Sequence, residues 1–440
     1  MPRQTLASRK SEGPRWRYFL RVLGPGLITG ASDDDPSGIA TYAQAGARFG
    51  LGLVWAALVT LPLMAGVQEI CDRTALATGK GLGDLIRDRF SRRARLVLAV
   101  LMGALVLANA LNIAADLAAV GDGMRLLHLG PTWLWAAIAG AIISVVLVRD
   151  SFDTIARLFK GLSMALVAYL VVLAVVDVNW ASVFRHTVVP HLSASTGYLT
   201  MVVAVLGTTI SPYLFFWQSA DRVEELREEP DVRGHAVPLE RRSPAGRKQK
   251  ERDSRADVFT GMAFSNLVMF AIIVATAATL GRTGQHDVAS AAEAARALRP
   301  VAGSLSSLLF ALGFIGSGML AVPVLAGSGS AGLAGLLGRR WGFSRSPRKA
   351  PVFYGLVLFG TVGGTLLGVV GINTMRLLVV VALINGLAAA PFLVVVMVIS
   401  GDRKLMGSHR NGRLARVMGW STAALMAAAA IALVATGGGS

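Results

Sequence analysis

Long apolar stretches alternate with short charged segments along this chain of 440 residues. Most of the stretches contain about 20 residues, which is enough for a helix to cross roughly 30 Å of hydrocarbon. Backbone amide groups inside lipid must form hydrogen bonds within their own segment, so these stretches are expected to be helices rather than open strands. The pattern predicts about eleven membrane-spanning helices, at residues 19–46, 51–71, 96–119, 132–148, 158–177, 198–219, 258–280, 303–336, 352–371, 377–400 and 414–436.

The composition also favours a membrane protein. Hydrophobic residues make up 54% of the chain and charged residues only 16%, whereas about a quarter of the residues in a soluble domain are charged. The net charge of +17 does not require a nucleic acid as partner, because the positive-inside rule explains it. When loops are assigned to alternate sides, 36 of the 43 Lys and Arg residues share the side of the N-terminus. The chain is therefore predicted to be a multi-pass protein of the cell membrane with a cytoplasmic N-terminus and an extracytoplasmic C-terminus.

The segment at residues 221–256 is the one long polar insertion in this pattern. It has ten Lys and Arg residues and few apolar ones, which predicts a flexible cytoplasmic loop with too little apolar surface to fold. Its basic residues either contact anionic lipid head groups or serve only to orient the chain.

Two of the predicted spans are interrupted near their middle. The first is broken at residues 32–38 (SDDDPSG) and the sixth at residues 207–213 (GTTISPY). In each break a proline removes an amide donor and clashes with the preceding helical turn, which lipid tolerates only where the backbone lines a protein cavity. Pro36 and Pro212 lie five spans apart, so the two halves of the chain run in opposite directions. This arrangement is typical of inverted-repeat transporters, which bind their substrate near the bilayer midplane.

Three aspartates stand in a row inside the first break. An ionised carboxylate costs about 2.5–3.5 kcal/mol at the bilayer centre, so it is retained where it faces water, a cation or a partner. Asp35 also fits an N-cap before Pro36, but Ser or Asn would cap at a lower cost, so a cation-binding role is favoured. Asp33 and Asp34 either bind a cation, face a vestibule or cap a helix end. In the sixth span, Ser211 has a structural alternative, which is a hydrogen bond to its own helix.

The residues around both breaks resemble those of the NRAMP (natural resistance-associated macrophage protein) family of divalent metal transporters. Residues 24–47 (GPGLITGASDDDPSGIATYAQAGA) resemble the first helix of that family, whose hallmarks are DPGN, IAT and QAGA. Residues 207–220 (GTTISPYLFFWQSA) resemble the sixth-helix motif GATxMPH with its nearby SA. In the third span, residues 115–118 (ADLA) resemble the segment TDIA. The resemblance covers nearly the whole chain.

The resemblance implies an all-α integral membrane fold, the LeuT-like inverted-repeat bundle, with discontinuous helices 1 and 6. Two repeats of five helices would be followed by one extra helix. The chain would then consist of a basic cytoplasmic N-terminus at residues 1–20 and a transporter domain at residues 21–440. Within that domain the resemblance implies repeat one at roughly residues 21–180, repeat two at roughly 198–400 including the loop at 221–256, and the extra helix at 414–436.

The resemblance also implies a metal site, with differences from the family pattern. In the family, the metal is held by the Asp and Asn of DPGN, by a backbone carbonyl and by the Met of MPH. Asp35 keeps the first position and Thr208 takes the carbonyl position, but the Asn position is Gly38 and Ser211 replaces the Met. The candidate metal-binding residues are Asp35, Ser211, Thr208, Gly38, Ser37 and Asp34.

These replacements remove the soft ligand. A thioether favours softer transition metals, whereas carboxylate, hydroxyl and carbonyl oxygens suit Mg²⁺, Ca²⁺ and Mn²⁺. The loss of two larger side chains also widens the site, and Mg²⁺ commonly keeps several of its waters. The pattern resembles the NRAMP-related magnesium transporters. It predicts alternating-access transport of Mg²⁺ or Mn²⁺, with the metal as the transported substrate and with no cofactor.

Proton coupling is expected to be weak or absent. Proton-coupled members of the family use a sixth-helix histidine and a third-helix glutamate, and the matching positions here are Tyr213 and Ala119. Asp116 remains in the third span as a further candidate for the transport pathway. The six histidines lie in predicted loops or at span ends, at positions 128, 186, 191, 235, 286 and 409.

Three other classes of protein remain open. An organic-solute or amino-acid transporter of the same fold would explain the broken helices, but an aspartate cluster would repel a carboxylate substrate. A membrane enzyme that uses Asp-bound Mg²⁺ on a lipid pyrophosphate would need basic residues within the membrane, and the Lys and Arg count places none there. A non-transporting sensor would be distinguished only by a flux assay. The sequence therefore predicts a transporter rather than an enzyme, and it does not predict protein partners or the oligomeric state.

Overall fold

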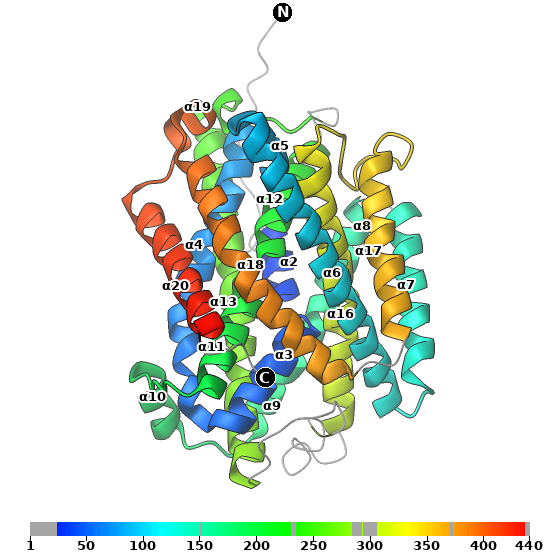
Figure 1. The fold of residues 1–440 in the computed structure, drawn as a ribbon, viewed down its shortest axis with the longest axis vertical. Helices are drawn as coiled ribbons and strands as arrows, with labels where there is room; N and C mark the ends of the chain where they lie inside the picture. The colour runs from blue at the N-terminus through cyan, green and yellow to red at the C-terminus, as the bar shows by residue number, and fades with distance from the viewer. Residues whose placement is uncertain are drawn as a thin grey trace, which may run out of the picture.

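Helices form nearly all of the structure in the computed structural model, which describes residues 24–149, 152–229, 235–283, 293, 306–369 and 373–435. No strand occurs among these residues, and the predicted all-helical fold is confirmed. Figure 1 shows the long helices gathered into one bundle, with many of them running along its long axis. The α-helices are α2 (Pro25–Asp33), α3 (Pro36–Phe49), α4 (Trp55–Thr78), α5 (Leu82–Arg89), α6 (Arg92–Leu126), α7 (Thr132–Arg149), α8 (Phe152–Ser163), α9 (Val167–Val175), α10 (Trp180–Val188), α11 (Thr196–Thr209), α12 (Pro212–Glu228), α13 (Pro244–Thr283), α16 (Ser306–Leu336), α17 (Pro351–Val369), α18 (Thr374–Gly401), α19 (Arg403–Met406) and α20 (Arg413–Ala435).

Nine of the described helices are long and apolar enough to cross a membrane, judged by length and composition. A tenth candidate consists of Pro36–Leu53 and Trp55–Thr78, which qualify only together and are bent by 107°. The described residues thus give nine or ten spans, where the sequence predicted about eleven. The difference arises early in the chain, because the first predicted span is divided between two short helices, and because α4 carries the buried polar residues Gln68 and Asp72.

The broken first span lies in the interior of the bundle. α13 packs against both α2 and α3, and α6 packs along α16. Residues 31–43 are buried throughout. By contrast, apolar side chains such as Leu96, Val97 and Val100 on α6 are exposed, as expected of a surface that meets lipid. The break is therefore enclosed by other helices, which is the condition for non-helical backbone at membrane depth.

Glycines allow α2 and α13 to approach at backbone distance. A Cβ atom at Gly30 would lie 2.1 Å from the carbonyl oxygen of Gly261, and a Cβ atom at Gly26 would lie 2.5 Å from the Cα atom of Val258. Even an alanine side chain would therefore push the two helices apart. This close approach holds α2 against α13 directly before the break.

The prediction of a flexible loop at residues 221–256 is wrong for most of that segment. α12 extends into it from one side and α13 begins within it, and residues 230–234 lie outside the described residues. The segment folds because its charges have opposite signs and form pairs. Lys250 Nζ, for example, lies 3.0 Å from a carboxylate oxygen of Glu225 and 3.1 Å from one of Glu229. Paired charges and helix formation replace the apolar surface that the segment lacks.

A buried arginine in this segment joins several helices. Arg222 of α12 is only 2% exposed, and its Nε donates a hydrogen bond to Asp72 of α4 at 2.6 Å. Its Nη2 donates to Asp257 of α13 at 3.1 Å. The Asp257 carboxylate also accepts hydrogen bonds from the backbone N–H groups of Gly24 and Gly26, at 2.7 and 2.8 Å. Asp257 therefore caps the N-terminus of α2 from another helix, where the unpaired amides and the helix dipole both favour a carboxylate.

Segments predicted to share one side of the membrane lie at the same end of the bundle. α5 and α19 lie near the top of Figure 1, and α10 lies near the bottom. Arg89 of α5 forms an ion pair with Asp402, which caps α19. This arrangement agrees with the predicted alternation of loops. The predicted cytoplasmic segment at residues 1–20 lies outside the described residues.

Substitution of the contact glycines tests the approach of α2 to α13. We expect Gly30→Ala and Gly261→Ala to lower the unfolding temperature in detergent, because the added Cβ meets backbone atoms and overpacking costs about 1–3 kcal/mol. Gly355→Ala in α17 is the matched control, since a Cβ atom there meets nothing within 4 Å and alanine favours a helix. Equal unfolding temperatures for all three purified variants would contradict the close contact between α2 and α13.

Candidate functional site at the helix breaks

The first break is formed by non-helical backbone at Asp34 and by a cap at Asp35. Asp34 (φ −88°, ψ 49°) ends α2, and Asp35 has an extended conformation at the N-cap of α3. One carboxylate oxygen of Asp35, Oδ1, accepts hydrogen bonds from Ser37 Oγ at 2.6 Å and from the Gly38 backbone N–H at 2.7 Å. Asp35 therefore does fulfil the capping role that the sequence offered as the structural alternative.

The second carboxylate oxygen of Asp35 faces two other helices. Oδ2 accepts a hydrogen bond from Asn112 Nδ2 of α6 at 3.3 Å and lies 3.4 Å from the Tyr213 hydroxyl of α12. That hydroxyl also lies 3.0 Å from the carbonyl oxygen of Ser32. Both contacts to Oδ2 are longer than the usual charge-assisted hydrogen bond to a carboxylate, which measures about 2.7–2.9 Å. Capping thus uses one oxygen of Asp35 fully and leaves the other weakly bound where α3, α6 and α12 meet.

The second break lies directly beside the first. α11 ends at Thr209 and α12 begins at Pro212. Thr208 Oγ1 lies 3.4 Å from Ser37 Oγ, and a Cβ atom at Gly38 would lie 3.2 Å from the same Thr208 oxygen. The structure therefore brings three of the predicted site positions together across the two broken spans.

Ser211 is hydrogen-bonded to its own chain segment. Its Oγ lies 2.6 Å from the carbonyl oxygen of Gly207 and 2.9 Å from that of Thr208, and it donates toward them. This is the structural alternative that the sequence left open. The hydroxyl proton is used locally, while the buried Ser211 oxygen keeps its capacity to accept or to bind a cation.

Three further carboxylates are buried close to Asp35 in the sequence or in space. Asp33 Oδ2 accepts a hydrogen bond from Ser265 Oγ of α13 at 2.7 Å. Neither oxygen of Asp34, and neither oxygen of Asp116 in α6, has a hydrogen-bond partner among the described residues. Asp33, Asp34 and Asp116 are all 0% exposed. Burying a carboxylate costs free energy unless it is protonated or is paired with a cation or water. This region is therefore suited to binding a cation.

The oxygen donors at the breaks are of mixed chemical type. In the described part of the chain, no three side chains of His, Cys, Asp or Glu are arranged as an all-protein metal cage. The two breaks instead bring together the Asp35 carboxylate, the hydroxyls of Ser37 and Thr208, and the Asn112 amide. Such a set suits a hard cation that keeps part of its water shell.

One further helix contributes a polar group to the site, and another carries a buried polar group, and neither group was predicted from the sequence. Asn112 of α6 contacts Asp35 directly, and Asn385 of α18 is buried with its amide nitrogen unpartnered among the described residues. A signal for Asn112 was present, because it stands four residues before Asp116 in an apolar stretch and therefore shares its helix face. The contact with Asp35 depends on packing between helices and was not visible in the sequence.

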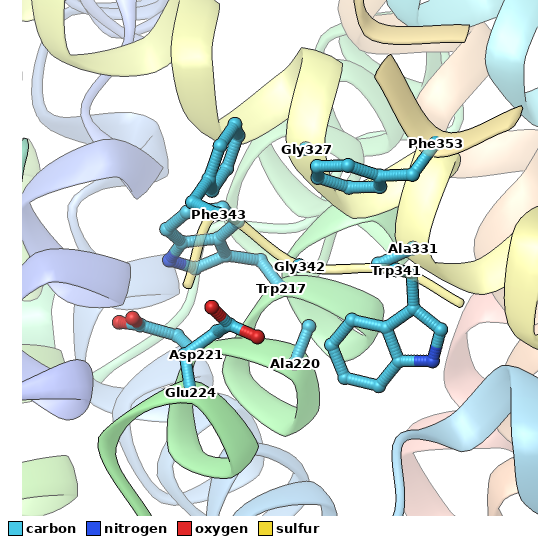
Figure 2. A pocket seen from close by; sticks show the side chains of 10 residues that line it. All are labelled: Trp217, Ala220, Asp221, Glu224, Gly327, Ala331, Trp341, Gly342, Phe343 and Phe353. Carbon is cyan, nitrogen blue, oxygen red and sulfur yellow. The ribbon is translucent and has the colours of Figure 1, made fainter. Parts of the chain in front are cut away.

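Asp221 of α12 is a further buried carboxylate. It borders a cavity of about 10 Å³ together with aromatic rings that include Trp217, Trp341 and Phe343 (Figure 2). Neither of its carboxylate oxygens has a hydrogen-bond partner in the part of the chain that the structure describes. A cavity of this volume admits about one water molecule and no organic solute. The sequence had placed Asp221 at the start of a flexible loop.

The sequence pattern of the family described as natural resistance-associated macrophage protein-like matches residues 26–436. The chain belongs to the NRAMP family. The match includes both helix breaks and nearly all of the predicted transporter domain. This confirms the resemblance that the motifs at the breaks indicated.

Two proteins of similar sequence are both named divalent metal cation transporter MntH. The divalent metal cation transporter MntH of Ralstonia nicotianae is 28% identical over 438 residues, which cover 96% of this chain and 92% of that protein. The divalent metal cation transporter MntH of Aeromonas hydrophila subsp. hydrophila is 27% identical over 420 residues, which cover 94% and 95%. The chain is thus a divalent metal transporter of the NRAMP type rather than an enzyme, and the metal is its substrate.

Solved structures of similar shape show the same fold. A crystal structure of the manganese transporter of Eremococcus coleocola matches with a TM-score of 0.75 at 18% identity, covering 97% of this chain and 88% of that chain. Mhp1, a nucleobase-cation-symport-1 family transporter in a closed conformation, matches with a TM-score of 0.52 at 18% identity, covering 94% and 93%. The LeuT-like architecture expected for an NRAMP protein is therefore confirmed.

Proposed function

We propose that this NRAMP transporter moves Mg²⁺ and Mn²⁺ in preference to softer transition metals, with Asp35 as its principal ligand. The proposal is supported by the different hydrogen bonding of the two oxygens of the Asp35 carboxylate. Oδ1 caps α3 with two short hydrogen bonds, whereas Oδ2 has only two long contacts, although the side chain is 1% exposed. A cation at Oδ2 would supply the strong partner that this buried oxygen lacks.

The remaining ligands in this proposal are oxygens at the two breaks. Ser37 and Thr208 offer hydroxyls on facing sides of the breaks, and Ser211 offers a buried oxygen beside them. Asp34 adds a carboxylate with no partner among the described residues. Gly38 contributes space rather than a donor. With no thioether in this set, the proposed site favours cations that prefer oxygen ligands.

The proposed mechanism is alternating access of the metal to the two sides of the cell membrane. The N-terminus of α2 is held by Asp257, and Asp257 is held by Arg222. A movement of α2 away from α13 would have to open the hydrogen bonds from Gly24 and Gly26 to Asp257. The uneven distribution of Lys and Arg supports a cytoplasmic N-terminus and an extracytoplasmic C-terminus, in which case this network closes the cytoplasmic side of the proposed site.

Removal of the Asp35 charge tests the proposed ligand. We expect Asp35→Asn to lower Mg²⁺ and Mn²⁺ uptake into proteoliposomes by roughly tenfold or more, because the carboxylate is replaced by a neutral amide. Asparagine remains a good N-cap, so this variant should stay folded, and Asp35→Ala should lose both the uptake and part of the stability. Uptake at the wild-type level by folded Asp35→Asn would show that Asp35 is only a cap.

Restoring softer ligands tests the proposed selectivity. We expect the double variant Ser211→Met and Gly38→Asn to shift the preference from Mg²⁺ toward Mn²⁺ and Cd²⁺, because a thioether is added and the space between the breaks is narrowed. A Cβ atom at Gly38 points at Thr208 Oγ1 and at the Asp33 carbonyl, each 3.2 Å away, so the new amide would enter that space. Uptake of the three metals in competition measures the shift, with Gly161→Asn as a control because its Cβ meets open space. An unchanged ratio of Mg²⁺ to Cd²⁺ would place both positions outside the site.

The residues beside Asp35 also bear on proton coupling. Tyr213 occupies the position of the family histidine, and a tyrosine hydroxyl, with an ordinary pKa of about 10, does not exchange a proton readily near neutral pH. His286, one of the six histidines, lies outside the described residues. We therefore expect an inward gradient of Mg²⁺ or Mn²⁺ to drive uptake without acidifying the lumen of proteoliposomes. Metal-dependent acidification that disappears in Asp116→Ala would establish coupling instead.

A further inference from the structure

The middle of α6 presents an amide and a carboxylate to the first break. Asn112 and Asp116 are one helical turn apart, so their side chains lie on the same face of the helix. Both are 0% exposed. A Cβ atom at Gly318 of α16 would lie 3.0 Å from the Asp116 carbonyl oxygen and 3.4 Å from Pro36 Cγ. This turn of α6 therefore lies next to the start of α3.

The Asn112 side chain is only half satisfied. Its Nδ2 donates to Asp35 Oδ2, whereas its Oδ1 has no hydrogen-bond partner among the described residues. Because both atoms belong to one planar amide group, Oδ1 lies close to the same carboxylate. A buried amide oxygen without a partner costs free energy, and Asn109 Oδ1 on the same helix also has none among the described residues. What distinguishes Asn112 is that its amide contacts the Asp35 carboxylate, where a cation could serve as the partner of both oxygens.

We propose that Asn112 Oδ1 is a direct ligand of the transported divalent cation, beside Asp35 Oδ2. The amide is an uncharged oxygen donor, and such donors bind hard cations such as Mg²⁺ and Mn²⁺. Asp116, one turn further along α6, accepts hydrogen bonds from water that the cation retains. The metal site then extends from the two broken spans to a third helix. This inference rests on the proposed function and specifies the ligands of the same site.

The competing explanation is that Asn112 only positions Asp35. Two substitutions separate these roles. Asn112→Ala removes both the oxygen and the N–H group. Asn112→Asp keeps an oxygen for a cation but has no N–H group to donate to Asp35, and it adds a second negative charge beside the first.

The experiment measures Mn²⁺ and Mg²⁺ binding to the purified full-length chain by calorimetry, together with uptake into proteoliposomes. If Asn112 is a ligand, Asn112→Ala should weaken Mn²⁺ binding by roughly tenfold, and Asn112→Asp should bind Mn²⁺ at least as tightly as the wild type. Asn109→Ala is the matched control. Asn109 is buried on the same helix and its Oδ1 likewise has no partner among the described residues, but its Nδ2 donates to Leu325 and Ser328 of α16 rather than to Asp35. Its loss should therefore leave metal affinity unchanged.

Asn112→Asp that binds Mn²⁺ more weakly than Asn112→Ala would overturn the proposal, since it would show that only the N–H group matters. Wild-type affinity in both variants would overturn it as well. If Asn112→Ala is not recovered folded, the comparison of Asn112→Asp with the wild type decides, and weaker binding counts against the ligand role. Failure of the proposed function is a separate result, because it would appear as wild-type metal binding in Asp35→Asn.

Discussion

The backbone of the first span leaves the helical conformation at Asp34 and Asp35 inside an apolar bundle, where lipid cannot satisfy the freed amide groups. One carboxylate compensates for this at the break itself, and a second caps the start of α2, at the other end of the same short helix. Asp35 accepts from the first turn of α3, and Asp257 accepts from the first turn of α2 across the contact between helices. The close approach of Gly30 to Gly261 holds α2 where Asp257 can reach it. The cap at the break is therefore a buried carboxylate where a neutral residue would also cap, and a buried carboxylate makes the region favourable for a cation.

Two pairs of buried acids in this protein differ in their partners. Asp72 and Asp257 share the guanidinium of Arg222, and this pairing ties α4, α12 and α13 together. Asp34 and Asp116 have no such partner among the described residues. An acid that is paired with arginine holds helices in place, because separating the pair would leave a buried charge uncompensated. An acid without a protein partner beside the two breaks can instead pair with a mobile cation, as the proposed substrate site requires.

The donors around Asp35 are oxygens from several helices, and this follows from what the chain lacks at two positions. Gly38 has no side chain, and the Ser211 hydroxyl is turned toward its own backbone. Neither position therefore supplies a strong soft ligand. The space is bordered instead by hydroxyls and by Asn112, which enters from α6. In the proposed site, selectivity would arise from weak, hard donors and retained water rather than from a tight cage.

The sequence by itself determined the helical membrane fold, because stretches of about 20 apolar residues have no alternative to a helix in lipid. It also identified both breaks and Asp35, since proline and a row of acids disrupt a span whatever surrounds it. Only the tertiary structure decided that Asn112 meets Asp35, 77 residues away, and that Arg222 pairs with Asp72, 150 residues away. Composition counts charges but does not reveal partners on other helices, and for this reason a charge-rich segment that forms buried pairs was predicted to be a flexible loop.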